Sequence, residues 1–303
     1  MKLKTKDLLT LDELSSNELL GIIDFAIKLK TELNKGKARP LAKNKTLAMI
    51  FQKPSTRTRV SFEVGMFQMG GHALNLSSND LQLSRGETIE DTARTLSRYV
   101  DVIMARVYDH QMIETLAKNS TIPVINGLSN SFHPCQTLAD LMTIKEKKKL
   151  KGIKIAWIGD GNNVCNSLIY GCSKLGINVS VATPKGFEPD NNVVKKSKNK
   201  ITLEITRNPE DAVKNADVVM TDTFSSIHHL DKNRAKKFYP KYQVNPSLMK
   251  KAKTSAIFMH CLPAKRGSEV TSSVIDGTQS VVWDQAENRL HTQKSLLASL
   301  LGI

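Results

Sequence analysis

Short apolar runs that alternate with helical patterns are the feature that most restricts the fold of this chain. Strands separated by helices imply parallel sheets with helices on both faces. In the first half, strands are expected at 46–51, 72–76, 101–107 and 122–126, and helices at 11–34, 56–69, 87–99, 110–118 and 134–148. In the second half, strands are expected near 153–158, 178–182, 201–205, 217–221 and 256–260. The pattern predicts an α/β protein whose ligands lie beyond the carboxyl ends of the strands.

A lysine-rich stretch that ends in glycine, Lys147–Gly152, separates the two series and marks a domain boundary. The first domain is expected to cover residues 1–147 and the second residues 148–283. A last helix at about 284–301 is expected to pack back across the first domain, which residues 284–303 complete. The predicted fold class is therefore α/β, with two doubly wound parallel-sheet domains joined by inter-domain helices.

The formal net charge of the chain is strongly positive, at +15, but its distribution does not favour nucleic-acid binding. Of the 44 basic residues only 11 are arginine, and the lysines occur in runs without interleaved aromatic residues. A surface for single-stranded nucleic acid needs such aromatic residues for base stacking. We interpret the runs as solvated faces whose field attracts an anionic substrate. A salt-dependent binding assay would reveal a nucleic-acid partner instead.

The cysteines and the N-terminus indicate a cytoplasmic protein. Four widely spaced cysteines without a C-x-x-C pair fit a reducing compartment and argue against a disulfide framework or a zinc site. The N-terminus lacks the apolar core of a signal peptide, and no apolar stretch approaches the length of a membrane span. Neither export nor a membrane partner is expected.

The segment Lys53–Arg59 reads Lys-Pro-Ser-Thr-Arg-Thr-Arg and follows the apolar strand 46–51 directly. Apolar residues at helical spacing after it predict a helix that begins near Ser55 or Thr56. The free N–H groups of the helix start, the helix dipole, three hydroxyls and two arginines make a site for a small dianion. The alternative is an ordinary N-cap with a solvated basic turn, but a cap needs only one hydroxyl.

Other segments of the first domain place polar side chains near strand ends. The sequence His133-Pro-Cys-Gln136 precedes an expected helix, and its imidazole and amide are suited to polarising a carbonyl oxygen. A proline-started helix without any function is the alternative. Arg106 ends an expected strand, where a charged side chain lines a pocket or extends to the surface. Gln82 lies in a loop, where a solvated role is equally compatible with the sequence.

In the second domain, the turn Gly159-Asp-Gly-Asn-Asn163 looks at first like a dinucleotide-binding loop. The G-x-G-x-x-G pattern is not completed, because Val164 occupies the third glycine position. The next strand also lacks the acidic residue that would bind a ribose. We therefore reject a nucleotide cofactor and assign the two asparagines to hydrogen bonds with an amino-acid head group.

Three more candidates come from the second domain and the last helix. Asp222 follows the strand 217–221, where a carboxylate suits a substrate ammonium or a helix cap. Cys261, in His260-Cys-Leu-Pro263, follows another strand, and its alternative role is that of a small buried hydrophobic residue. A covalent nucleophile would need a base and positive surroundings, so we favour a positioning role for the thiol. Arg289, on the expected last helix, is either a surface arginine or is aimed into the substrate site where that helix crosses back over the first domain.

Taken together, these motifs resemble the aspartate/ornithine carbamoyltransferase family over about residues 3–303. The S-T-R-T-R turn is shared across the family, whereas H-P-C-Q and H-C-L-P are typical of its ornithine branch. The resemblance implies transfer of the carbamoyl group from carbamoyl phosphate to the δ-amino group of L-ornithine, without a covalent intermediate. It implies no metal or organic cofactor and no nucleic-acid partner. It also implies a homotrimer or a multiple of trimers.

The resemblance further implies roles for individual residues. The carbamoyl phosphate-binding residues would be Ser55, Thr56, Arg57, Thr58, Gln82, Arg106, His133, Gln136, Cys261, Leu262 and Arg289. Gln82 would reach the site of a neighbouring subunit. The ornithine-binding residues would be Asn163, Asp222, Ser226 and Ile227. The catalytic residues would be Arg106, His133, Asp222, Cys261 and Arg289.

The loop that follows Asp222 departs from the family pattern. The family usually reads Asp-x-Trp-x-Ser-Met-Gly, whereas this chain has Phe224 in place of tryptophan, Ile227 in place of methionine and His228 in place of glycine. Glycine adopts backbone dihedrals that histidine does not, so the mobility of the loop is expected to differ. A carbamoyltransferase for putrescine or an N-acylated ornithine therefore stays open. So does an inactive relative that only binds anions.

Overall fold

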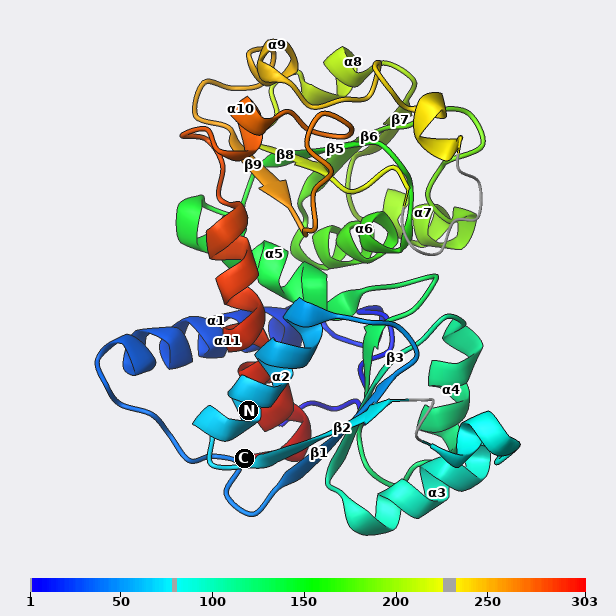
Figure 1. The fold of residues 1–303 in the computed structure, drawn as a ribbon. Helices are drawn as coiled ribbons and strands as arrows, with labels where there is room; N and C mark the ends of the chain where they lie inside the picture. Colours follow the sequence, from blue (N-terminus) through cyan, green and yellow to red (C-terminus); the bar gives the residue numbers. More distant parts are fainter. Residues whose placement is uncertain (1, 78–80, 226–232) are drawn as a thin grey trace. The chain divides into compact units, whose positions relative to one another are not determined.

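The computed structural model describes residues 2–77, 81–225 and 233–303. The chain divides into two compact units (Figure 1). The first consists of Met1–Met142 with Glu287–Ile303, and the second of Thr143–Ala286. Both unit boundaries fall inside helices, α5 (Pro134–Lys147) and α11 (Val282–Leu301). Among the helices that the structure describes, none has both the length and the apolar character needed to cross a membrane.

Unit 1 is built on a parallel sheet with the strand order β2-β1-β3-β4 in the part that the structure describes. Its strands are β1 (Thr46–Phe51), β2 (His72–Ser77), β3 (Val102–Arg106) and β4 (Val124–Leu128). Its helical elements, besides parts of α5 and α11, are α1 (Ser16–Asn34), α2 (Thr56–Gln68), η1 (Gln82–Arg85), α3 (Ile89–Tyr99) and α4 (His110–Asn119). Figure 1 shows α3 and α4 together on one face of this sheet and α2 on the other.

Unit 2 is built on a second parallel sheet, whose described strands have the order β7-β6-β5-β8-β9. The strands are β5 (Lys154–Ile158), β6 (Asn178–Ala182), β7 (Leu203–Thr206), β8 (Val218–Thr221) and β9 (Ile257–His260). The helical elements are α6 (Asn163–Leu175), α7 (Asn191–Lys198), α8 (Pro209–Val213), η2 (Arg234–Lys237), α9 (Pro246–Met249) and α10 (Ser272–Ile275). In Figure 1, α6 and α7 cover one face and α8, α9 and α10 the other. The predicted α/β class with two parallel sheets is confirmed.

Strand register brings the predicted motifs to one edge of each sheet. In unit 1, Phe51 at the end of β1 lies beside Arg106 at the end of β3. In unit 2, Ile158 pairs with Thr221, and Thr221 pairs with His260. The segments that follow these three strands therefore start side by side at the carboxyl edge of the sheet.

The predicted strands occur at or within a few residues of their expected positions, but the first helix was predicted to start too early. It begins at Ser16 rather than at residue 11. Ser15 accepts a hydrogen bond from the backbone N–H of Glu18, whose carboxylate accepts one from the backbone N–H of Ser15. This capping box fixes the helix start. Upstream of it, the Glu13 carboxylate accepts from the backbone N–H groups of Thr10 and Leu11, which therefore lie in a turn.

Candidate active site

The start of α2 in unit 1 has the geometry of an anion-binding site. Ser55 is the N-cap, in an extended backbone conformation, and its hydroxyl accepts from the backbone N–H of Thr58 at 3.2 Å. The first N–H groups of a helix lack intrahelical acceptors and lie at the positive end of its dipole. Ser55 and Arg57 are half-buried, Thr56 is exposed and Thr58 is buried. These groups at a helix start are suited to binding phosphate.

The second arginine of the motif does not join this group. Arg59 is exposed, and its Nε lies 3.6 Å from Oε2 of Glu63, one helical turn further along α2. The pair is a solvated i,i+4 ion pair. Of the two arginines in the motif, Arg57 is therefore the one that we assign to the anion.

His133, directly before α5, is a buried imidazole surrounded by positive charge. It is 4% exposed. Burial lowers its pKa well below the ordinary value of 6.5, and the charges of Arg289, Arg106 and Arg57 lower it further. The imidazole is therefore neutral near pH 7, and a neutral imidazole carries one N–H, which is an uncharged hydrogen-bond donor. The same charges indicate that the three predicted arginines lie near His133 within unit 1.

Arg289 is held inside unit 1 by two other residues of the predicted site. Its Nη1 donates to Oε1 of Gln136 at 2.7 Å, and its Nη2 donates to Oγ1 of Thr58 at 3.2 Å. All three side chains are at most 2% exposed. The structure thus joins the helix start of α2, the beginning of α5 and the C-terminal helix in one polar cluster. Arg289 is a buried residue and not the surface arginine that the sequence left open.

A lysine of the same motif was not among the predicted site residues. Lys53 is 1% exposed, and its ammonium lies 3.9 Å from the ring centroid of Tyr108. Burial, together with the charge of Arg106, lowers its pKa to about 8. A buried lysine is uncommon, and its place in the Lys-Pro-Ser-Thr-Arg turn was the only sequence signal for it. Lys53 adds to the positive field at this edge of the sheet.

In unit 2, Asp222 follows β8 and accepts three hydrogen bonds. The donors are Nδ2 of Asn162 at 2.7 Å, the backbone N–H of Thr223 at 2.7 Å and the Cys261 thiol at 3.2 Å. The carboxylate is buried, with 8% of the residue exposed. These donors fix its orientation and leave it suited to binding a cationic or amine group.

Asn162 has a role that the sequence did not assign. Its side-chain oxygen caps α6 by accepting from the backbone N–H groups of Val164 and Cys165, while its amide nitrogen donates to Asp222. The Gly159–Asn163 turn therefore positions a carboxylate and does not resemble a phosphate loop. A Cβ at Gly161 would lie only 2.2 Å from the backbone nitrogen of Pro189, so close packing explains that glycine.

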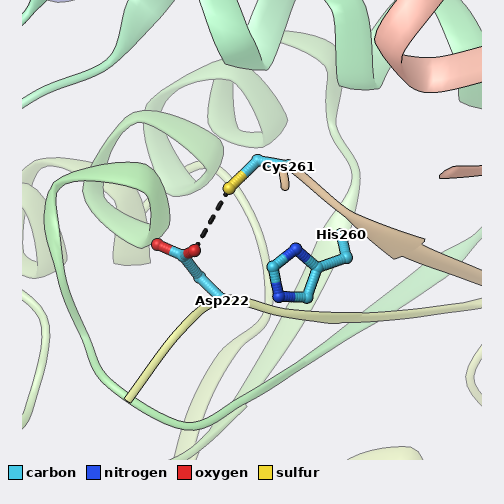
Figure 2. Close-up of side chains that lie close together, drawn as sticks. All are labelled: Asp222, His260 and Cys261. Atoms are coloured by element: carbon cyan, nitrogen blue, oxygen red, sulfur yellow. Dashed lines mark hydrogen bonds between the residues drawn. The ribbon is translucent and has the colours of Figure 1, made fainter. Parts of the chain in front are cut away.

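Cys261 lies next to Asp222 because β8 and β9 are neighbouring strands, as Figure 2 shows. The thiol is half-buried and donates to Oδ1 of Asp222. Leu262, the next residue, has a positive φ of 57°, and its backbone N–H donates to Nδ1 of His260 at 2.8 Å. The His260 Nε2 lies 3.2 Å from Oε1 of the fully buried Glu269. His260 is thus a support for the turn that carries Cys261 and Leu262.

Asp222, His260 and Cys261 also form a possible metal-ligand set, since their donor atoms lie within 4.8 Å of one another. Both imidazole nitrogens of His260 already have protein partners, the Leu262 N–H and Glu269. A metal ligand needs a free lone pair on one of these nitrogens. The arrangement therefore fits a hydrogen-bonded cluster better than a metal site.

Phe224, at the family's tryptophan position, belongs to the hydrophobic core of unit 2. It is fully buried and stacks on Phe238, with ring centroids 4.8 Å apart. Ser226, Ile227 and His228 lie outside the described residues. Gln82 is exposed at the start of η1, and Asn163 is half-buried at the start of α6.

Unit 1 has an anion cradle with a neutral imidazole, and unit 2 has an oriented carboxylate beside a thiol. Such features suit an enzyme that binds a phosphorylated donor and an amine acceptor. Residues 6–146 match the family model described as the aspartate/ornithine carbamoyltransferase carbamoyl-P binding domain, and residues 151–300 match that of the Asp/Orn binding domain. The chain belongs to the aspartate/ornithine carbamoyltransferase family.

Full-length relatives support the assignment. The chain is 63% identical over 301 residues to ornithine carbamoyltransferase from Cenarchaeum symbiosum, with 99% of both chains covered. It is 54% identical to the protein of Pyrococcus furiosus named ornithine carbamoyltransferase, anabolic, with 100% of this chain and 98% of the relative covered. A solved structure of ornithine carbamoyltransferase from Pyrococcus furiosus has a TM-score of 0.94 at 56% identity, with 98% of this chain and 97% of that chain covered.

Proposed function

We propose that this protein transfers the carbamoyl group of carbamoyl phosphate to the δ-amino group of L-ornithine, giving L-citrulline and phosphate. The full-length similarity to ornithine carbamoyltransferases carries the proposal. In this proposal residues 1–147, completed by residues 284–303, bind carbamoyl phosphate. Residues 148–283 bind ornithine.

The phosphate group is assigned to the start of α2. The backbone N–H groups there and the hydroxyls of Ser55 and Thr56 donate to its oxygens. The guanidinium of Arg57 binds two phosphate oxygens at once, which an ammonium does not do. As the bond between the carbonyl carbon and the phosphate oxygen breaks, charge grows on the departing phosphate. The same donors stabilise that charge.

The carbonyl oxygen of carbamoyl phosphate is assigned to Arg106, His133 and Arg289, together with the Thr58 hydroxyl. When the amine nitrogen bonds to the carbonyl carbon, this oxygen becomes an oxyanion. Donors that are already in place stabilise it, and the loss of one such donor typically costs about 3–4 kcal/mol of barrier. The low pKa of His133 keeps its imidazole neutral, so it acts here as a hydrogen-bond donor. Gln136 is assigned to the carbamoyl group beside Arg289.

The acceptor is assigned to Asp222 and Cys261, which orient the δ-amine. An ammonium has no lone pair with which to attack, so the ornithine ammonium must lose one proton to solvent before the carbon–nitrogen bond forms. The bonded nitrogen then loses a second proton, which the departing phosphate accepts. Asn163 is assigned to ornithine, and Leu262 is assigned to carbamoyl phosphate. The roles of Ser226 and Ile227, outside the described residues, stay predictions from the family resemblance. Holding two reactants in line supplies on the order of 7–11 kcal/mol, so the scheme needs no covalent enzyme intermediate.

The assembly is proposed to be a homotrimer or a multiple of trimers, in which Gln82 of one subunit reaches the carbamoyl phosphate site of another. The exposure of Gln82 in unit 1 is compatible with that role. A cytoplasmic location is proposed because all four cysteines are free thiols. The biosynthetic direction, towards arginine, is proposed because a 54%-identical relative is named anabolic.

The test is citrulline formation from carbamoyl phosphate and L-ornithine, with putrescine, N-acetylornithine and aspartate as competing acceptors in parallel assays. A preference for ornithine by a factor of about 100 or more in kcat/KM is the expected result, since a site built around a charged head group rejects analogues that lack it. Preference for another amine would overturn the ornithine assignment. Absence of product with all four acceptors would overturn the proposed enzyme activity.

A further inference from the structure

Behind the polar cluster of unit 1 lies a buried carboxylate that the proposed mechanism does not use. Asp140 is on α5, one turn after Gln136, and it is fully buried. The Gln136 Nε2 donates to Oδ1 of Asp140 at 2.8 Å, while its Oε1 accepts from Nη1 of Arg289 at 2.7 Å. The amide of Gln136 therefore connects a buried carboxyl group to a buried guanidinium.

The two end groups dictate the direction of this amide. An ionised carboxylate only accepts hydrogen bonds, and a guanidinium only donates them. The amide NH2 must therefore face Asp140 and the amide oxygen must face Arg289. The reversed amide would set its oxygen against the carboxylate and its NH2 against the guanidinium, so that both contacts would become repulsive. Polar groups without a suitable partner are costly in a buried site.

The guanidinium is held on its other side as well. Its Nη2 donates to the Thr58 hydroxyl and, in the Gln293 amide orientation that satisfies both ends of that side chain, to the Gln293 oxygen at 2.9 Å. A buried charge is stable when it is paired and its hydrogen bonds are satisfied. Asp140 places a carboxyl group one side chain away from Arg289.

We infer that Asp140 is a positioning residue of the carbamoyl phosphate site. Through Gln136 it fixes which end of the amide faces the carbamoyl group, and it fixes where Arg289 is held. This inference rests on the proposed function. It assigns Asp140 no contact with either substrate.

Exchanging the amide of Gln136 and the carboxyl group of Asp140 tests the inference. In Gln136→Glu, the donor from residue 136 to Asp140 is replaced by a second carboxylate, and kcat/KM for carbamoyl phosphate should fall by about 100-fold or more. In Asp140→Asn the direction of the amide is imposed by Arg289 alone, and a fall of about tenfold is expected. In the double variant, the introduced asparagine donates to the introduced glutamate, which still accepts from Arg289. Its kcat/KM should return to within about tenfold of the wild type, far above the product of the two single losses.

The matched control is Thr137→Val, an isosteric change at a fully buried position of the same helix, and it should leave kcat and KM unchanged. All variants are also unfolded with urea. The inference is overturned if the double variant loses as much as the product of the single variants. It is equally overturned if the Asp140 change lowers stability but leaves KM and kcat as in the wild type.

Failure of the proposed function would look different. In that case the wild type would form no citrulline. The wild type, the two single variants of Gln136 and Asp140 and the double variant would then be titrated with fresh carbamoyl phosphate while their unfolding temperature is followed. A bound ligand raises that temperature by an amount that grows with its affinity. If the double variant regains the rise in unfolding temperature on addition of carbamoyl phosphate, the positioning role of Asp140 is supported without any turnover. If the double variant does not regain that rise, the positioning role is overturned.

Discussion

Replacing Asn162 by serine should impair the use of ornithine while leaving the cap of α6 in place. The Asn162 oxygen caps α6, and its amide nitrogen donates to Oδ2 of Asp222 at 2.7 Å. Serine caps a helix about as well as asparagine, so the change of the cap itself should alter the free energy of unfolding by no more than about 0.5 kcal/mol. The hydrogen bond to the carboxylate is lost, because serine has no amide to reach it.

A hydrogen bond to a charged group contributes about 1.5–3 kcal/mol. Its loss should therefore lower kcat/KM for ornithine by roughly 10- to 150-fold. Asn162→Asp keeps the cap too but sets a second carboxylate against Asp222. Two such groups cannot both ionise at low cost, so this variant should lose more activity, and the loss should grow as the pH rises.

The assay is initial-rate citrulline formation with ornithine varied at saturating carbamoyl phosphate, with urea unfolding of the same samples. Asn208→Ser is the matched control, because Asn208 caps α8 in the same unit by accepting from the backbone N–H of Glu210. It should leave both kinetic constants unchanged. Wild-type kcat/KM for ornithine in Asn162→Ser would refute the argument that this amide positions Asp222.

Three further predictions concern the proposed catalytic groups. Arg57→Gly should abolish measurable citrulline formation and leave the circular dichroism spectrum unchanged; retained turnover would contradict the phosphate assignment. Cys261→Ala should raise the KM for ornithine and slow turnover by about 10- to 100-fold, because Asp222 loses a donor. Intact-mass spectrometry of the wild type during turnover should show no carbamoylated Cys261, whose detection would overturn the noncovalent scheme. His133 binds a proton below pH 6.5 when unfolded but not when folded, so stability should fall as the pH drops below about 6.5. Between about pH 7.5 and 5.5, the free energy of unfolding in urea should fall by about 1.4 kcal/mol more for the wild type than for His133→Asn, whereas parallel curves would refute the buried neutral imidazole.

Much of the fold could be predicted because buried parallel strands are continuous apolar runs. The run 46–51 occurs as β1, with most of its side chains fully buried. The start of α1 was predicted five residues too early, although Ser15 and Glu18 carry the capping-box pattern in the sequence itself. An apolar periodicity that extends past a cap is not by itself evidence of a helix.

The site could be predicted only where its residues belong to local motifs. Ser55, Thr58 and Arg57 follow one strand directly, and His133 and Gln136 open one helix. The role of Asn162 depends on its contact with Asp222, and that of Asp140 on the contact between Gln136 and Arg289; both contacts join residues that are distant in sequence. Nor did the motif itself distinguish Arg57 from Arg59, since their difference arises from which face of α2 each occupies.

The most direct test of the account is the stoichiometry of the wild-type reaction, measured as citrulline formed and phosphate released from carbamoyl phosphate and L-ornithine. The account predicts one phosphate for each citrulline, and no enzyme-catalysed phosphate release when ornithine is omitted. Phosphate release without citrulline would contradict it, because the anion site of unit 1 would then belong to a hydrolase and not to a carbamoyl-group transferase.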